Sequence, residues 1–323
     1  MTRYIIRRII LSIPVILAVL FYSFLMIRLQ PHGPFASKTL SEQLRITMET
    51  RYGLHRPLQE QFMIYVGNVL RGDLGPMLGM RHETVNEVVA LAVPVTLQLA
   101  ALAMILGLVI GIPAGVLAAL WHNRPLDYLS TFFAVVGISI PNLVLAPLLA
   151  FIFGLKLDWF PIAFWGADPP FILGVFPKPS PDFFLHAVLP TATLATPVSA
   201  SVARLVRASL LDVMTQDYIR TARAKGLSEK TVLFIHAMKN ALIPTVTILG
   251  PLFITLLPGM VVVERIFALN GLARLMVDSV FAREYFLLSG SNLIFAVLLV
   301  AGNLIADVLY VWLDPRIKYG EMH

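Results

Sequence analysis

The sequence predicts an all-α polytopic membrane protein with six transmembrane helices. The 323-residue chain is 58% hydrophobic and only 14% charged, with a mean hydropathy of +0.79. A soluble domain is usually about 45–50% apolar and about 25% charged, so a water-soluble fold could not cover this much apolar surface. Six long runs contain no Asp, Glu, Lys or Arg, and basic residues gather between alternate runs.

Each of the six runs is long enough to cross a bilayer, whose core of about 30 Å takes about 20 helical residues. The first run follows a basic start and contains no small-residue cleavage site, which predicts an uncleaved helix. The second is longer than a span requires, so we expect part of it to form a loop. We expect the last to continue to Leu313. The runs are residues 9–27, 88–123, 128–155, 183–203, 241–263 and 285–306.

The basic residues predict cytoplasmic N- and C-termini. With this orientation, the inside segments hold 13 basic and six acidic residues, a balance of +7. The outside segments hold 12 basic and 12 acidic residues. Because cytoplasmic loops of membrane proteins carry an excess of Lys and Arg, this orientation is favoured. We therefore assign the net charge of +6 to topology and not to nucleic-acid binding.

Four segments follow from this topology. Residues 1–29 form the first helix with its basic start, and residues 30–90 form a folded outer subdomain. Residues 91–313 form a five-helix core, with a cytoplasmic loop at 204–240. Residues 314–323 are a cytoplasmic tail.

The two outer loops have different predicted characters. In the first, Ser41 can cap a short helix that Gly53 ends, and Pro57 suits the first turn of another that Gly72 closes. This subdomain is either a cap on the helix ends or, less favoured, a ligand site. The second loop, residues 156–182, carries Trp159, Trp165 and six prolines. We expect it to be irregular and to lie along the outer surface, because Trp favours the membrane interface.

The inside loop at residues 204–239 is basic and contains no proline. Thr215 and Asp217 provide a helix start, and Gly226 provides a stop. Ser228 can cap a second short helix that begins at Glu229. About 36 residues exceed what a connector needs. The residues alone leave two interpretations open, a docking surface for a cytoplasmic partner or a solvated basic loop.

The sequence lacks the common motifs for nucleotide binding, metal binding and nucleophilic catalysis. There is no phosphate-binding Gly-x-x-x-x-Gly-Lys-Ser/Thr loop, and His82-Glu83 lacks the second histidine of a zinc-protease motif. Cysteine is absent, which excludes thiolate metal sites and cysteine nucleophiles. We predict no catalytic, cofactor or metal residues. Candidate translocation-path residues are polar groups within spans, Asn142, Asn303 and Asp307, although Asp307 is better explained by a structural pairing near the inner end.

One segment of the inside loop resembles a known family. Residues 217–244 read DYIRTARAKGLSEKTVLFIHAMKNALIP. This is similar to the cytoplasmic loop of binding-protein-dependent ABC permeases, in particular the B-type subunit of the dipeptide/oligopeptide/nickel branch. The general loop reads Glu-Ala-Ala, three residues, then Gly. Aligned on Gly226, Arg220 and Thr221 depart from it and Ala222 matches, and the departures resemble the variant of the peptide branch.

Other segments extend the resemblance over nearly the whole chain. Residues 51–75 resemble the outer-loop signature of B-type subunits, and residues 314–317 resemble their C-terminal ending. Asn270-Gly271-Leu272 stands where these proteins usually have Pro-Gly-Leu. Residues 283–285 read Arg-Glu-Tyr where Arg-Asp-Tyr is usual.

The resemblance implies a non-catalytic permease subunit in a bacterial or archaeal inner membrane. It also implies several partners. These are a homologous C-type permease, one or two cytoplasmic ATPase chains that bind ATP and Mg, a solute-binding protein, and membrane lipid. Solutes of this branch include peptides, glutathione, nickel chelates, opines and some oligosaccharides. The residues that would couple to the ATPase are Asp217, Tyr218, Arg220, Thr221, Ala222, Arg223, Lys225, Gly226 and Leu227.

Three other classes of membrane protein are alternatives to this one. An ion-coupled secondary transporter is the main alternative, but it would show more intramembrane charge and internal repeats. A membrane enzyme would need clustered polar or metal-binding residues at the membrane surface. A structural assembly subunit has no distinguishing motif.

Overall fold

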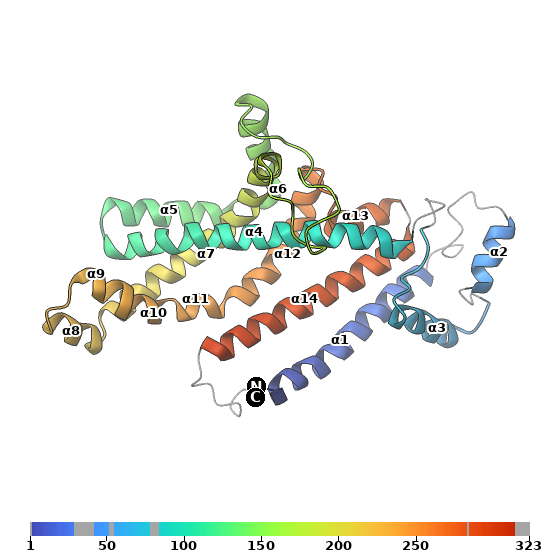
Figure 1. The fold of residues 1–323 in the computed structure, drawn as a ribbon, viewed down its shortest axis with the longest axis horizontal. Coiled ribbons are helices and arrows are strands. Elements are labelled where there is room, and N and C mark those ends of the chain that lie inside the picture. Colours follow the sequence, from blue (N-terminus) through green and yellow to red (C-terminus); the bar gives the residue numbers. More distant parts are fainter. Residues whose placement is uncertain (1, 29–41, 52–54, 78–83, 283, 314–323) are drawn as a thin grey trace.

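The computed structural model describes residues 2–28, 42–51, 55–77, 84–282 and 284–313. These residues form helices joined by turns and loops (Figure 1). The α-helices are α1 (Thr2–Arg28), α2 (Glu42–Arg51), α3 (Leu58–Leu70), α4 (Val85–Leu120), α5 (Pro125–Ser139), α6 (Asn142–Leu149), α7 (Pro181–Met214), α8 (Asp217–Ala224), α9 (Glu229–Thr231), α10 (Met238–Ala241), α11 (Ile243–Thr247), α12 (Leu249–Ile266), α13 (Leu272–Phe281) and α14 (Tyr285–Leu313), and the π-helical segments are η1 (Ala150–Lys156) and η2 (Val232–Ala237).

Among the described residues, five helices are long and apolar enough to cross a membrane, and a bent pair makes a sixth candidate. The five are α1, α4, α7, α12 and α14. The expectation that part of the second run forms a loop holds only for residues 121–123, which lie in the turn after α4, because the rest of the run belongs to this 36-residue helix. At 1.5 Å per residue it is about 54 Å long, so it extends beyond a bilayer core of about 30 Å.

The third charge-free run is bent, because it forms two helical segments that together make the sixth candidate span. Helix α5 stops at Ser139, Ile140 is extended at φ −85° and ψ 115°, and α6 starts after Pro141. The chain bends by 106° between the two helical segments. Proline provides the reason, because its ring disfavours helical geometry in the residue before it and it has no N–H to donate.

Helices α4 and α7 form the centre of the packed core. Three glycines at four-residue spacing on α4 face valines on α7, and a Cβ at any of them would overlap the opposite helix. Small residues at this spacing let two helix backbones approach closely. The glycines are Gly107, Gly111 and Gly115, and the valines are Val198, Val202 and Val206.

The terminal helices α1 and α14 lie side by side and antiparallel (Figure 1). Helix α3 packs on α1 through Phe62, whose ring lies 5.4 Å from Phe21 and 5.3 Å from Phe24. Pro57 immediately precedes α3 instead of occupying its first turn, and Gly72 follows its end at φ +81°. The predicted cap Ser41 and stop Gly53 lie outside the described residues.

The loop between η1 and α7 is irregular, as expected, but it does not simply lie along the surface. Trp165 is buried in the core, where its Nε1–H donates to Gln98 Oε1 at 2.6 Å and its ring meets Phe183 edge-on. Gln98 in turn donates to the carbonyl of Val175. Trp165 therefore does not lie on the surface of the protein, because a polar partner on α4 allows burial of its N–H.

Candidate functional site

Helix α8 is attached to the core by one face. It begins two residues after α7 ends, and Ile219 and Ala222 are both buried in the main hydrophobic core. They join Leu210 of α7 and Val232 and Leu233 of η2 in that core. Residues three apart share a helix face, so α8 has one buried and one open side.

A left-handed glycine ends α8. Gly226 has φ +77°, its N–H donates to Arg223 O at 2.9 Å, and the Leu227 N–H donates to Ala222 O at 3.4 Å. This pair of bonds is the Schellman arrangement, which glycine favours because it has no Cβ to strain. No atom lies within 4 Å of where a Gly226 Cβ would be. The predicted stop at Gly226 is confirmed.

Further hydrogen bonds stabilise the turn between α8 and α9. The Ser228 hydroxyl accepts the Thr231 N–H at 3.3 Å, so the predicted cap is confirmed. Across the turn, the Arg223 guanidinium donates to both carboxylate oxygens of Glu229, at 2.9 and 3.3 Å. These bonds connect the two sides of the turn between α8 and α9.

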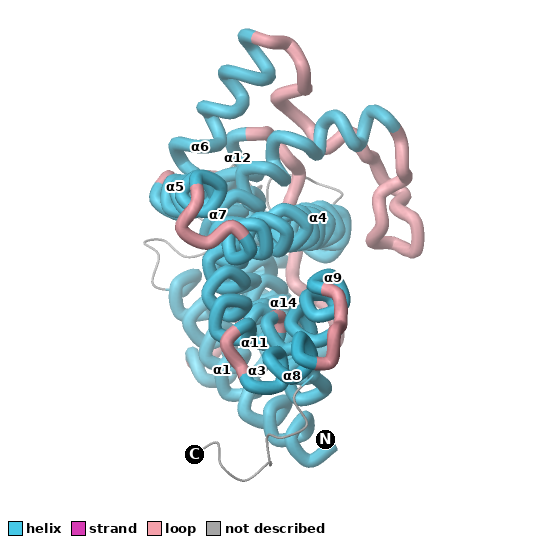
Figure 2. The backbone as a smooth tube through the Cα atoms, turned by 90° about the vertical axis from the view of Figure 1, so that its left-hand side faces the viewer, coloured by secondary structure: helices cyan, strands magenta, loops and turns pink. Residues whose placement is uncertain are grey.

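The open side of α8 carries most of the predicted coupling residues (Figure 2, which views the molecule from the α8 end). Tyr218 is partly exposed, and its hydroxyl accepts from the Asn240 side chain at 2.8 Å. Ala222 alone among the predicted residues lies on the buried face. The exposed residues are Asp217, Tyr218, Arg220, Thr221, Arg223, Lys225, Gly226 and Leu227.

Two apolar side chains that the sequence interpretation missed also lie at this end. Phe234 and Ile235 of η2 are 66% and 64% exposed. The signal for them was an apolar pair inside a basic loop. We use the name hairpin surface for these two side chains together with the exposed residues of α8 and its turn, a set that combines basic and apolar groups.

A partly buried ion pair between α5 and α7 was also missed. Arg207 of α7 binds Asp127 of α5 through Nε at 2.6 Å and Nη2 at 2.8 Å. The Asp127 carboxylate also accepts the Asn123 N–H at 3.0 Å and lies 3.1 Å from His122 Nδ1. Its side chain is only 3% exposed. Reading charged residues as run boundaries hid this pair, because Asp127 directly precedes the third run.

The three candidate path residues lie on two helices. Asn142 is the first residue after the break at Pro141, is half-buried, and packs against Gly259 of α12. Asn303 is half-buried on α14. Asp307 lies in the same helix, and its side chain is outside the described residues.

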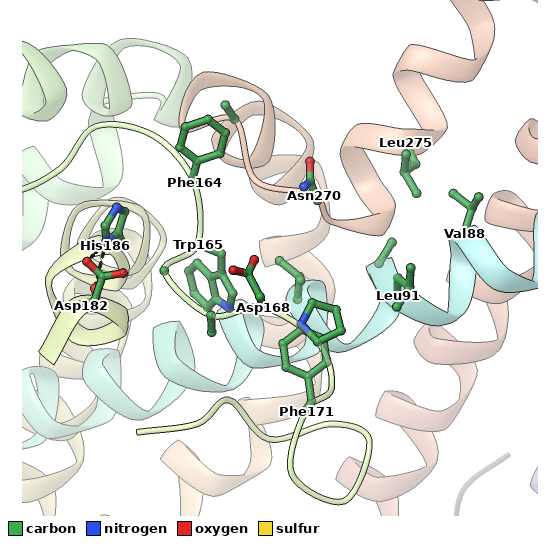
Figure 3. Close-up of a pocket in the computed structure, with 16 residues that line it drawn as sticks. Val88, Leu91, Phe164, Trp165, Asp168, Phe171, Asp182, His186, Asn270 and Leu275 are labelled. Atoms are coloured by element: carbon green, nitrogen blue, oxygen red, sulfur yellow. Dashed lines mark hydrogen bonds and ion pairs between the residues drawn. The ribbon is translucent and has the colours of Figure 1, made fainter. Parts of the chain in front are cut away.

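A cavity of about 630 Å³ lies between the N-terminal part of α4, the loop before α7, and α13 (Figure 3). Loop residues Trp165, Asp168 and Phe171 form one wall, and Leu91 of α4 and Leu275 of α13 form another. In the part of the chain that the structure describes, no group of three His, Asp or Glu side chains could hold a metal ion.

The fold defines an all-helical membrane protein whose α8 and following turn form an ordered segment at one end. Residues 111–319 match the family of binding-protein-dependent transport system inner membrane components, and the chain belongs to this family. This agrees with the resemblance of the inside-loop motif.

Full-length relatives support the same assignment. The chain is 39% identical to an oligopeptide transport system permease protein of Bacillus subtilis, over 99% of this chain and 100% of that one. It is 38% identical to a glutathione transport system permease protein of Escherichia coli, with 99% and 100% coverage. It is 37% identical to a dipeptide transport system permease protein of B. subtilis, with 98% of both chains covered.

A solved structure shows the same fold at low identity. A chain of an inward-facing methionine ABC transporter matches with a TM-score of 0.54 and 17% identity. The match covers 69% of this chain and 94% of that chain.

Proposed function

We propose that this chain is the membrane permease subunit of an ATP-driven importer of peptides or similar small solutes. Family membership supports an importer subunit, and the names of the relatives support the solute class. The chain would form half of the translocation path. ATP and Mg would bind to separate ATPase subunits, in agreement with the missing phosphate-binding motif.

The observation that carries the proposal is the geometry of the hairpin surface. Helix α8 is attached to the core through Ile219, its end is defined at Gly226, and the Arg223–Glu229 pair closes the turn. A docking element needs this rigidity, because a force applied to a loose loop would not reach the spans.

The chemistry of the hairpin surface suits a protein groove with acidic groups. Arg220 and Lys225 are exposed cations, and Tyr218 and Leu227 add apolar contact area. Arginine also pairs with carboxylates in a two-pronged geometry. We assign this groove to the ATPase, with Asp217, Thr221 and Arg223 at its margin, Gly226 as the turn, and Ala222 as the anchor of α8 to the core.

Transport would follow from movement of this docked helix. When ATP closes the ATPase subunits, α8 would move with them and carry α7 and η2, which share its core contacts. The spans would then rock between inward-open and outward-open states, with both termini cytoplasmic. A solute-binding protein would deliver its solute at the end that carries α3, and a C-type permease would complete the path.

The proposed path includes the break in the third span. Non-helical backbone at membrane depth is tolerated where it is buried in protein or lines a cavity. Asn142 lies at such a break and packs against α12. We assign Asn142 and Asn303 to the path, with Asp307 near its inner end.

Purification with native partners tests the proposal. The chain is isolated in mild detergent from cells that express its neighbours, and co-purifying chains and ATP hydrolysis are measured. A homologous permease, ATPase chains and vanadate-sensitive hydrolysis are expected. Purification as a lone chain or homo-oligomer without ATPase activity would contradict the proposal and favour an ion-coupled secondary transporter.

A further inference from the structure

A fully buried carboxylate lies at the end of the molecule remote from the hairpin surface. Glu264 is in the last turn of α12 and is 0% exposed. It directly follows the fifth charge-free run, so it marked a boundary in the sequence. Buried carboxylates need partners, because removing a charge from water is unfavourable.

The partners of Glu264 lie on two other helices. The hydroxyl of Thr96, on α4, donates to Glu264 Oε1 at 2.6 Å and accepts the Leu272 N–H at 2.8 Å. Glu264 Oε2 accepts the Arg274 N–H at 2.8 Å, and the Ala273 N–H also binds the carboxylate.

These bonds cap α13 from outside. The first N–H groups of a helix have no partner within the helix and form its positive end, which suits a carboxylate. For α13, side chains of α4 and α12 supply that cap. Helix α4 therefore meets the consecutive helices α12 and α13, which are distant from it in sequence, at one buried polar site.

Gly271 makes the close approach feasible. Its φ of −94° is open to any residue, so the glycine is not needed for its backbone geometry. A Cβ there would overlap the Glu264 carboxylate, whose three atoms are the nearest neighbours of that position. The missing side chain at Gly271 thus leaves room for the Glu264 carboxylate, which also binds Thr96. This gives the glycine of the Asn270-Gly271-Leu272 motif a specific role.

The capped helix forms part of the outer cavity wall. Leu275 of α13 and Asn270 of the preceding turn line the cavity opposite Trp165 and Asp168 (Figure 3). The loop itself is tied to the turn after α12, because the Phe164 N–H donates to Phe267 O at 3.0 Å. A shift of α4 relative to α12, or of α13 relative to either helix, would therefore break bonds of the cap.

We infer that Thr96 and Glu264 are positioning residues that make α13 one body with α4 and α12, so that the outer cavity wall follows the rocking of the spans. This inference rests on the proposed transport function. It predicts that loss of the cap separates the outer wall from the ATP-driven cycle without stopping ATP hydrolysis.

A cysteine reporter tests the inference, because the chain contains no cysteine. Asn270→Cys, an exposed cavity position, is introduced in the assembled complex, and its rate of maleimide labelling is measured without nucleotide and after vanadate trapping. With Thr96 intact, we expect the two rates to differ several-fold. Thr96→Val should abolish most of that difference while hydrolysis continues, and Thr96→Ser should preserve it.

Gly271 variants cover the case in which Thr96→Val does not assemble. Gly271→Ala should also abolish the rate difference, because its Cβ would overlap the Glu264 carboxylate and break the cap. Adding Glu264→Ala should cause no further loss, because the cap is already absent. An unchanged rate difference in assembled Thr96→Val or Gly271→Ala complexes would overturn the inference. Equal rates in an otherwise unaltered, ATP-hydrolysing complex would overturn it as well, whereas a complex with no ATPase activity would overturn the proposed function itself.

Discussion

At the scale of single residues, two glycines illustrate two different requirements. Gly226 is needed for its backbone, since its φ is +77° and open space lies where a Cβ would be. Gly271 is needed for space, since its φ is ordinary and the Glu264 carboxylate occupies the Cβ position. A sequence shows both as glycine, and only the structure separates the two reasons.

Gly226→Val should uncouple ATP hydrolysis from transport. A left-handed conformation costs an L-residue about 1–2 kcal/mol, so the end of α8 should change shape or loosen. We expect the complex to assemble and hydrolyse ATP while solute uptake falls strongly. The measurement is uptake per ATP hydrolysed.

Gly72→Val is the matched control for this prediction. Gly72 also has a positive φ, +81°, and open space at its Cβ position, but it follows α3 at the opposite end. The same backbone penalty there should leave the ratio of uptake to hydrolysis unchanged. An equal fall in both variants would remove the coupling role from the Gly226 turn.

Asp127→Ala should destabilise the permease, because Arg207 would lose both of its bonds to the carboxylate. Hydrogen bonds to charged groups contribute about 1.5–3 kcal/mol each to stability. The thermal melting midpoint of the detergent-solubilised complex should fall. Asp127→Ala combined with Arg207→Ala should cost less than the sum of the single changes, and strict additivity would argue against a coupled pair.

At the scale of elements, local signals predicted the hairpin after α7 well. The stop at Gly226 and the cap at Ser228 depend on residues adjacent in sequence, and both are confirmed. The bend of the third span was missed although Pro141 lay within it, because proline is tolerated in many membrane helices. Whether a proline kinks or breaks a helix depends on packing, here of α6 against α12.

Long-range polar contacts were not predictable from the sequence. Thr96 and Glu264 are 168 residues apart, and Asp127 and Arg207 are 80 apart. No local pattern links such pairs, and a search for charge-free runs treats each charge as an end point. The sequence also did not determine which side of α8 faces the core. Ala222 was therefore grouped with the coupling residues although it is buried.

Charge reversal on the exposed side of α8 should weaken ATPase binding without affecting the fold. Arg220→Glu with Lys225→Glu changes two exposed side chains. Complementary charges across an interface mainly set association and specificity. The amount of co-purifying ATPase should fall, and higher salt should narrow the difference from the unaltered chain, because salt screens exposed charges.

Arg71→Glu is the control for this charge reversal, because Arg71 is exposed at the opposite end. It should leave the amount of ATPase unchanged. Unchanged ATPase recovery in the Arg220→Glu, Lys225→Glu double variant would place the ATPase elsewhere.

At the scale of the whole molecule, α8 and α3 lie at opposite ends of the helical bundle (Figure 1). Single cysteines can test the predicted orientation in this cysteine-free chain. Leu70→Cys, an exposed position at the end of α3, should react with an impermeant maleimide in spheroplasts. Lys225→Cys should react only after the membrane is opened. The reverse pattern would invert the topology.

ATP-dependent uptake by the reconstituted complex tests the central claim most directly. The complex is placed in proteoliposomes with its solute-binding protein outside, and uptake of a labelled peptide is followed with ATP inside, with ATP absent, or with a proton or sodium gradient alone. We predict uptake only when ATP is present on the side that carries α8. Uptake driven by an ion gradient without ATP would contradict the account and identify a secondary transporter.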